Sequence, residues 1–267
     1  MDLRCYKRKV ENPGARSNIR AGMNSVSVLG VRVNDINKDG LISQVQEWAD
    51  QTRLRTVVYV NAHCLNTAYI DTEYRNILNQ ADLTFPDGIG VVWAGRWLGG
   101  TQLEKLNGRV WFPEICKIAV KRNWSIYILA GIRGVAACAK NILQNRYPGL
   151  QIVGATDGFF AERSDTEVLQ EITELRPNIL FVGMGAPLQE KWIATHRDAI
   201  PVPVVWAVGA LFDTVVGIEK LAPDWLNALA LEWFWRLLMD PRKKWRRYLI
   251  GNPLFLFRVF RQKYIRK

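Results

Sequence analysis

Short apolar runs rich in β-branched residues alternate along the chain with amphipathic stretches. The apolar runs occupy residues 56–60, 125–130, 150–153, 179–182 and 202–208. Alternating strand and helix signals of this kind predict a mostly parallel sheet with helices on both faces. Most runs end in a glycine or a polar turn, and open α/β sheets bind their ligands beyond the carboxyl ends of the strands. We therefore expect the chemistry in these turns.

The pattern changes after Pro223. Asp224 can cap a helix that continues to Leu238 and is apolar on nearly every side. A basic segment follows, and then leucines and phenylalanines interleaved with Arg258 and Arg261. This end of the chain is predicted to be a helical, basic appendage that docks on another surface, which this pattern alone does not identify. The predicted organisation is a polar leader, an α/β domain that carries the chemistry, and the appendage, at residues 1–22, 23–223 and 224–267.

The positive charge is concentrated in the same appendage. The formal net charge of +11 and the pI of about 9.7 predict an anionic partner, which is a nucleic acid, a phospholipid surface or a phosphorylated substrate. From Arg236 onward, eleven basic residues accompany a single acid, Asp240. The 267 residues are 49% hydrophobic, enough for one sizeable core, so a single large domain is favoured over two.

Cysteine usage and hydropathy bear on the compartment. The four cysteines are far apart and form no CxxC pair, which argues against a zinc site or a disulfide framework and favours a reducing cytosol. Neither a signal-peptide core nor a run of roughly 18 to 20 apolar residues is present, so we expect no membrane span. Residues 1–22 are polar and basic, and translation can start at Met1 or at Met23.

The strongest local signal is Pro86-Asp87-Gly88, which follows an apolar strand end and precedes an apolar helix. One interpretation is an ordinary turn, because Pro-Asp-Gly is a common turn sequence. The other is a carboxylate held at a strand end, where it can accept a proton. A positioned general base contributes about 10² to 10⁴-fold to a rate.

A second segment, residues 183–192, leads from a glycine-rich strand end into a helix with Pro187 near its first turn. It is either an ordinary strand–helix loop or a phosphate or sugar site built from backbone N–H groups and the helix dipole. The Gly131–Gly134 loop is a weaker candidate, because it lacks the full dinucleotide-binding spacing and the acidic partner further on.

Motifs that the chain lacks narrow the chemistry. It has two histidines, His63 and His196, in no HxxxH or HExxH pattern, and it has no DxD, GxSxG or Walker motif. A catalytic metal, an acyl hydrolase and a P-loop ATPase are therefore disfavoured. His196 is interpreted as a structural residue, and His63, close to a strand end, as a weak site candidate.

Taken together, these segments resemble the WecG/TagA/CpsF family of glycosyltransferases from about Val28 to Tyr248. Each matching piece is modest, but their order and spacing extend over most of the chain. The pieces are 60–63 (VNAH), 86–93 (PDGIGVVW), 107–108 (NG), 156–160 (TDGFF), 185–192 (GAPLQEKW), 209–213 (GALFD), 222–225 (APDW), 231–233 (LEW), 241–242 (PR) and 245–248 (WRRY).

This resemblance implies a compact Rossmann-like α/β domain with a C-terminal membrane-binding appendage. It also implies a metal-independent, inverting transfer of a hexosyl group, of the N-acetylmannosaminyl or glucosyl type, from a UDP-sugar to a polyprenyl-diphosphate-linked glycan. By motif, Asp87 is the expected catalytic base, Asn61 and Gln189 are expected to contact the sugar, and Phe159 and Asp213 match positions near the nucleotide. Neither a cofactor nor a metal is expected.

Basic residues are expected to meet the charge of the leaving diphosphate, because no metal does so. The candidates are Lys105 in the domain and Arg236, Lys243 and Arg246 in the appendage, which by resemblance folds over the pocket. Lys105 stands where the family usually has arginine, so the bidentate fork that suits a diphosphate is lost. This departure bears on donor and acceptor identity more than on reaction type.

The resemblance also implies partners and a location. The expected partners are the UDP-sugar, the lipid-linked glycan in surface-polysaccharide or cell-wall synthesis, and an anionic membrane at the cytoplasmic face of the bacterial inner membrane, with no nucleic acid. Relatives suggest self-association that masks the apolar tail. Two alternatives stay open: an NAD(P)-dependent oxidoreductase on a similar sheet, and a basic nucleic-acid-binding module. For the tail, a solvated charged end is the alternative to a membrane-binding one.

Overall fold

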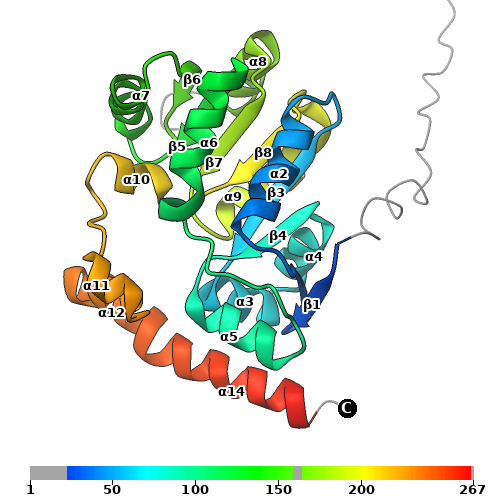
Figure 1. Cartoon of the computed structure of the whole chain (residues 1–267). Helices are drawn as coiled ribbons and strands as arrows, with labels where there is room; N and C mark the ends of the chain where they lie inside the picture. The colour runs from blue at the N-terminus through cyan, green and yellow to red at the C-terminus, as the bar shows by residue number, and fades with distance from the viewer. Residues whose placement is uncertain (1–22, 159–163, 266–267) are drawn as a thin grey trace, which may run out of the picture.

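A six-stranded parallel sheet forms the centre of the protein in the computed structural model, which describes residues 23–158 and 164–265 (Figure 1). In spatial order the strands are β4 (Leu83–Pro86), β3 (Arg55–Val60), β8 (Val204–Ala207), β7 (Ile179–Gly183), β5 (Ser125–Ala130) and β6 (Gln151–Thr156). Each neighbouring pair is parallel. The central strands are buried on both faces, which is why they appear in the sequence as continuous apolar runs.

Helices cover both faces of this sheet, as the alternating pattern predicts. One face packs against α2 (Lys38–Ala49), α6 (Gly108–Arg122), α7 (Val135–Arg146) and α10 (Leu211–Val215). The other packs against α3 (Ala62–Ile70), α4 (Thr72–Gln80), α8 (Asp165–Leu175) and α9 (Leu188–His196), and α9 continues into the 3₁₀ turn η2 (Arg197–Ala199). In β3, the neighbours Val57 and Val58 point to opposite faces. The Rossmann-like α/β fold class is thus confirmed.

An antiparallel hairpin precedes the parallel sheet and was not predicted. It consists of β1 (Ser25–Val28) and β2 (Val31–Asn34), joined by Leu29 and Gly30. Both turn residues have positive φ, +53° and +83°, as a tight two-residue hairpin requires. Each strand has only four residues, too short for a clear alternation. The hairpin contacts α5 (Ile89–Trp97), the helix that follows β4.

The appendage is a chain of helices rather than one long helix. It comprises α11 (Asp224–Ala228), α12 (Glu232–Met239), α13 (Pro241–Trp245), the π-helical turn η3 (Arg246–Ile250) and α14 (Gly251–Tyr264). The prediction of one continuous helix to Leu238 is wrong, because α11 ends in a Schellman turn. Ala230 has a left-handed backbone with φ +60°. Its N–H donates to the backbone carbonyl of Asn227, and the Leu231 N–H donates to the backbone carbonyl of Leu226.

The last helix completes the core of the α/β domain. Figure 1 shows α14 running beneath α3 and α5, and its Phe255 and Val259 are buried in the same apolar cluster as those helices. Asn66 of α3 donates to the Gly251 carbonyl at 2.7 Å, and Arg258 donates back to Asn66. Helices with the length and hydropathy of a membrane span are absent from the described residues.

Candidate functional site

Two polar side chains meet where β3 and β4 end. Asn61 caps α3, because its Oδ1 accepts from the backbone N–H groups of His63 and Cys64 at 3.0 and 3.1 Å. Asp87 follows β4, and its backbone N–H donates to the Val60 carbonyl at 2.9 Å. The Asn61 side chain also hydrogen-bonds to the Asp87 carboxylate. Since the Asn61 oxygen is used by the cap, the amide N–H is the group that faces Asp87.

Burial raises the pKa of Asp87 to about 6. Arg236 opposes this rise, the nearby carboxylate of Glu232 adds to it, and Arg247 and the Asn61 hydrogen bond oppose it. A carboxylate with a pKa near neutrality is mostly ionised at pH 7 and is a much stronger base than an exposed aspartate. Asp87 therefore has the properties of a general base. His63 lies beside it, and burial lowers the pKa of its imidazole, so the ring is neutral.

Asp87 lies on a wall that two cavities share. One is a polar cavity of about 220 Å³ over the ends of β3, β4, β7 and β8. The other is an apolar groove of about 430 Å³ between the domain and the appendage. The side chains common to both linings are Asn61, His63, Asp87, Glu232, Arg236 and Arg247. A group held in one cavity can thus reach a group held in the other across Asp87.

Charged side chains of both signs line the polar cavity, and its carboxylates are Asp87, Glu219 and Glu232. Its cationic lining residues are Arg109, Arg236, Lys244 and Arg247. Asn107 and Trp111 also line this cavity, and Asn107 Oδ1 and Trp111 Nε1 are buried atoms without a hydrogen-bond partner among the described residues. Buried polar atoms are normally paired, so these two atoms are exceptions. Trp111 is held in place by stacking on Trp206, with ring centroids 4.0 Å apart.

The apolar groove exists because the appendage packs against the domain. Ile89 of α5 forms one side, and Trp233, Leu249, Phe255 and Leu256 of the appendage form the other. Ile89 and Leu256 remain 43% and 46% exposed, so the groove opens to the surface. A long apolar chain fits this opening better than a sugar or a nucleotide.

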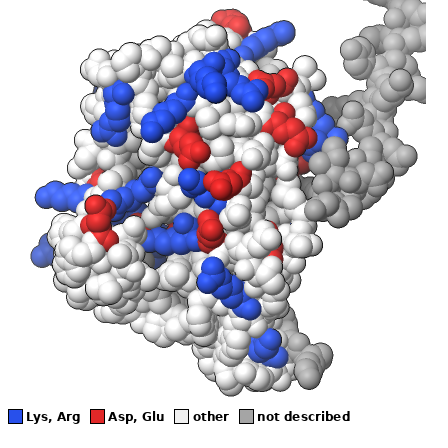
Figure 2. Space-filling view, in the orientation of Figure 1, with Lys and Arg blue, Asp and Glu red and all other residues white. Residues whose placement is uncertain are grey.

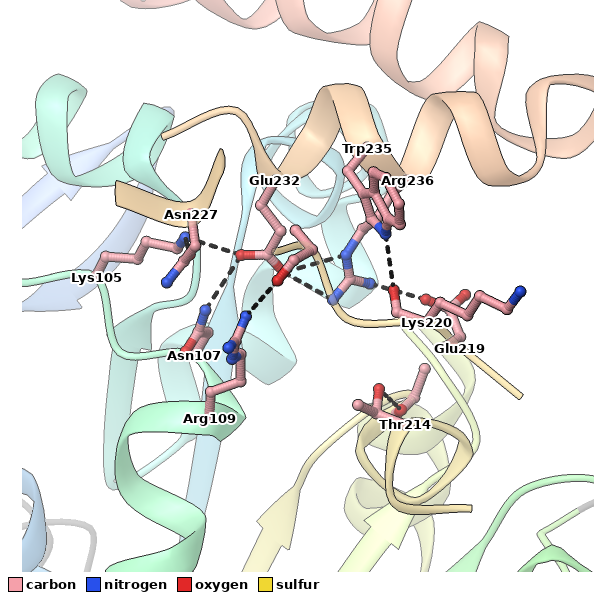
Figure 3. Close-up of polar contacts among 12 residues, drawn as sticks. Lys105, Asn107, Arg109, Thr214, Glu219, Lys220, Asn227, Glu232, Trp235 and Arg236 are labelled. Carbon is pink, nitrogen blue, oxygen red and sulfur yellow. Dashed lines mark hydrogen bonds and ion pairs between the residues drawn. The ribbon is translucent and has the colours of Figure 1, made fainter. Parts of the chain in front are cut away.

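Polar contacts fix the appendage over the site (Figure 3). Lys105 Nζ lies 2.8 Å from Glu232 Oε2 and donates to Asn227 Oδ1 at 2.6 Å. Arg109 donates to the Ala222 carbonyl at 2.7 Å and pairs with Asp224. These contacts join Lys105, which precedes α6, and Arg109, in the first turn of α6, to residues 222–232.

Within α12, Arg236 holds two carboxylates. It donates to Glu232 Oε1 at 2.9 Å and to Glu219 Oε2 at 3.1 Å, and Lys244 also pairs with Glu219. Figure 2 shows basic and acidic side chains interleaved across the middle of this face, whereas the lower part, over the appendage, carries few of them. The charged side chains in the middle of this face thus border a part of the surface with few charged side chains.

Comparison with known sequences decides the family. The sequence model described as "Glycosyl transferase WecG/TagA/CpsF family" matches residues 26–267. The chain belongs to the WecG/TagA/CpsF family of glycosyltransferases. The match includes the appendage, so the helices that close the site are part of the family unit.

Two relatives carry the name N-acetylglucosaminyldiphosphoundecaprenol N-acetyl-beta-D-mannosaminyltransferase. The Bacillus subtilis (strain 168) protein is 30% identical over 217 residues, which is 81% of this chain and 83% of the relative. The Staphylococcus aureus (strain MW2) protein is 29% identical over 248 residues, which is 91% of this chain and 95% of the relative. The similarity therefore extends over nearly the whole length of both proteins.

The residues singled out from the WecG/TagA/CpsF resemblance differ in which cavity they line. Asn61, Asp87 and Arg236 line both cavities, and Lys105 lines the apolar groove. Lys243 and Arg246 line neither. The Lys243 side chain is 85% exposed, and Arg246 lies over the Trp245 ring.

Gln189 is fully buried and does not line the polar cavity. Its Oε1 accepts from the N–H groups of Gly185 and Gly209 at 3.3 and 2.9 Å, and its Nε2 donates to Glu190. The side chain thus ties the β7 loop to the β8 loop beneath the cavity, where Gly185 is a lining residue. In this arrangement Gln189 holds the two loops that border the cavity.

The two residues expected near the nucleotide are not in the described lining. Asp213 lies in α10, between the lining residues Leu211 and Thr214, and burial raises the pKa of its carboxyl. Phe159 lies outside the described residues, as does the 1–22 leader with its choice of start between Met1 and Met23.

Several residues of the site carried no predicted role. They are Tyr59, Asn107, Glu219, Glu232, Lys244 and Arg247. Glu232 has a local signal, because residues 225–238 are mostly apolar and Glu232 and Arg236 are the two charged residues among them. Asn107 and Arg247 lie in the matching pieces 107–108 and 245–248, whereas only the fold brings Tyr59, Glu219 and Lys244 to this cavity.

One observation bears on the oxidoreductase alternative. The start of α7, after the Gly131–Gly134 loop, is already capped by a carboxylate of the protein itself. Asp157 accepts from the backbone N–H of Gly134 at 2.8 Å and from that of Ala136 at 3.3 Å. A dinucleotide diphosphate would need these N–H groups at a helix N-terminus. The loop is thus unsuited to that role.

Proposed function

We propose that the protein transfers a hexosyl group, of the N-acetylmannosaminyl or glucosyl type, from a UDP-sugar to a polyprenyl-diphosphate-linked glycan. The reaction is a single displacement with inversion, it requires no metal ion or cofactor, and Asp87 is the base. The acceptor lipid carries N-acetylglucosamine in the names of the relatives, and this is the first acceptor to test.

The observation that carries this proposal is the position of Asp87 between two cavities of opposite character. The polar cavity offers cations to a nucleoside diphosphate, and the apolar groove offers hydrocarbon contact to a polyprenyl chain. A transferase for a lipid-linked sugar needs both, with a base where the donor and acceptor sugars meet. The shared wall supplies that base.

The chemistry then follows from the groups present. The acceptor hydroxyl gives its proton to the Asp87 carboxylate while its oxygen forms the new bond to the anomeric carbon of the donor. The bond from that carbon to the β-phosphate oxygen breaks, and UDP leaves with the electron pair. Arg236, Lys244 and Arg247 line the cavity where this negative charge grows. Preorganised cations in a water-poor site stabilise such a charge.

The appendage also provides a surface for peripheral binding to an anionic membrane. Its exposed apolar side chains include Leu249, Ile250, Phe257, Phe260 and Ile265, each at least 49% exposed. Lys243 and Arg246, which line neither cavity, supply positive charge in the same appendage. Apolar contact combined with basic residues attracts a protein to anionic lipid, and a substrate that resides in the bilayer makes the cytoplasmic leaflet the working location.

The test is to incubate the protein with a panel of UDP-sugars and short-chain polyprenyl-diphosphate N-acetylglucosamine, with and without a chelator. We expect a disaccharide-lipid product by mass spectrometry, an inverted anomeric linkage by NMR, and equal rates when the chelator is present. Transfer with retention, or loss of activity in chelator, would contradict the mechanism. Failure of every donor would contradict the function.

A further inference from the structure

Glu232 joins three side chains at the boundary between the domain and the appendage. Its Oε2 lies 2.8 Å from Lys105 Nζ and accepts from Asn107 Nδ2 at 3.2 Å. Its Oε1 accepts from Arg236 Nε at 3.2 Å and Nη2 at 2.9 Å. Figure 3 shows the carboxylate pointing from α12 between Lys105 and Arg236. Glu232 is therefore the hub of these contacts.

The carboxylate fixes the orientation of the amide of Asn107, a residue of the polar-cavity lining. Because the amide nitrogen of Asn107 donates to Glu232, its oxygen is turned away from Glu232 and has no partner among the described residues. Lys105 and Arg236 have long side chains that lose rotamer freedom when they are ordered. Glu232 fixes both in the absence of substrate, so part of this entropy cost precedes binding.

Glu232 also belongs to the charges around Asp87. The charged groups are Arg236 and Glu232 from α12 and Arg247 from η3, and the neutral titratable groups beside them are Tyr59 from β3 and His63 from the start of α3. Burial alone would raise the pKa of Glu232, but Arg236 and Lys105 hold it below the usual value, so the carboxylate is ionised. Its negative charge raises the pKa of Asp87, while the two arginines lower it.

We propose that Glu232 is a positioning residue for sugar transfer, which holds Lys105, Asn107 and Arg236 in their working arrangement around Asp87. This inference rests on the proposed function. Glu232 itself does not touch the reacting atoms. It acts through Arg236, which lines the polar cavity, through the orientation of the Asn107 amide, and through its charge beside the base.

The test compares Glu232→Gln with Glu232→Asp. In Glu232→Gln we expect kcat to fall about 10- to 100-fold, because the cations and the Asn107 amide lose their common acceptor. The dissociation constant of UDP, measured by calorimetry, should stay equal or become up to about tenfold tighter, because a negative charge next to the diphosphate is removed. The acid limb of the kcat/KM profile should move to lower pH. Glu232→Asp keeps the charge and should keep the acid limb of the parent protein.

Asp224→Asn is the matched control. It removes an ion pair between the same two parts of the chain, but the Asp224 side chain is 90% exposed and belongs to neither cavity lining. We expect its kcat within about twofold of the parent, as for most exposed ion pairs. Thermal unfolding of each variant identifies any that fails to fold.

Two results would overturn the inference. An unchanged kcat in folded Glu232→Gln would show that Glu232 positions nothing important. A lower kcat accompanied by tenfold weaker UDP binding and an unmoved acid limb would show that Glu232 only holds the appendage closed. The parent protein distinguishes these failures from failure of the proposed function, since a parent that neither binds UDP nor turns over would refute the function itself.

Discussion

The polar cavity and the apolar groove meet at Asp87 but are assembled in different ways. The polar cavity lies mainly over strand ends, with Tyr59, Asn61 and Gly185 in its lining. Most of the groove comes from the appendage, and the domain adds chiefly the start of α5. The first location is the usual ligand site of a parallel sheet. The second appears only once the appendage packs against α3 and α5, so docking of the appendage creates the side proposed for the acceptor.

Removal of the base should lower the transfer rate more than any other change. Because Asp87 belongs to the polar cavity and to the apolar groove, this change should affect both sides of the site equally. In Asp87→Asn we expect transfer to fall by about 10² to 10⁴-fold, because an amide cannot take up the acceptor proton. UDP affinity, measured by calorimetry, should change by less than about tenfold. A folded variant with the turnover of the parent would refute the assignment of the base.

Removal of a cation should weaken the polar side. Arg247→Met should lower kcat about 10- to 100-fold, since Arg247 lines the cavity where the diphosphate charge develops. Lys243→Met, four residues earlier and outside both linings, is the control and should stay within about twofold in detergent solution. Equal losses in the two variants would indicate a general charge effect rather than a site.

The pH dependence should report the same base. The pKa of Asp87 is raised to about 6, so its basic form is lost as pH falls through 6. We expect kcat/KM to drop about tenfold per pH unit below that value. Steady-state rates between pH 5 and pH 8 provide the check. A profile that stays flat down to pH 4.5 would mean that another group accepts the proton.

A change in the groove should affect only the lipid acceptor. Leu256→Ser should raise KM for a long-chain polyprenyl acceptor about fivefold, because a partly exposed leucine contributes on the order of 1 kcal/mol to apolar contact. KM for the UDP-sugar should not change. Phe257→Ser alters the next residue, which is 61% exposed and outside the groove, and it should leave both constants unchanged in detergent.

The smallest effect concerns the membrane surface. Lys243→Met should lower partitioning onto anionic vesicles about fivefold, since one basic residue near an anionic leaflet contributes about 1 kcal/mol. The control is Lys121→Met at the far end of α6, which should bind like the parent. Co-sedimentation at two salt concentrations measures both variants. Equal binding of Lys243→Met and the parent would place this part of α13 away from the lipid.

The sequence predicts the sheet and the strand-end positions of Asn61 and Asp87 because both depend on local signals. Buried parallel strands leave continuous apolar runs, and Asn61 and Asp87 follow two of them directly. The β1–β2 hairpin was missed because four-residue strands give little alternation. The break at Ala230 was missed because an alanine in a left-handed turn has no sequence signature.

The cations of the appendage could not be assigned from sequence for a geometric reason. Lys243 and Arg246 are three residues apart and share one helix face, and Lys244 and Arg247 share the next. Either pair could face the site. The packing of α13 and the π-helical turn at Arg246–Ile250 decides the choice, and the second pair lines the polar cavity. Lys105 and Glu232 pair across more than a hundred residues, which no local pattern encodes.

The most direct test of the account asks whether donor and acceptor sites coexist on either side of Asp87. Asp87→Asn, which should not turn over, can be saturated with UDP and then titrated with a short-chain polyprenyl-diphosphate N-acetylglucosamine in a calorimeter. We predict that the acceptor binds UDP-saturated protein at least as tightly as free protein. Competition, with UDP displacing the acceptor, would contradict the two-cavity account.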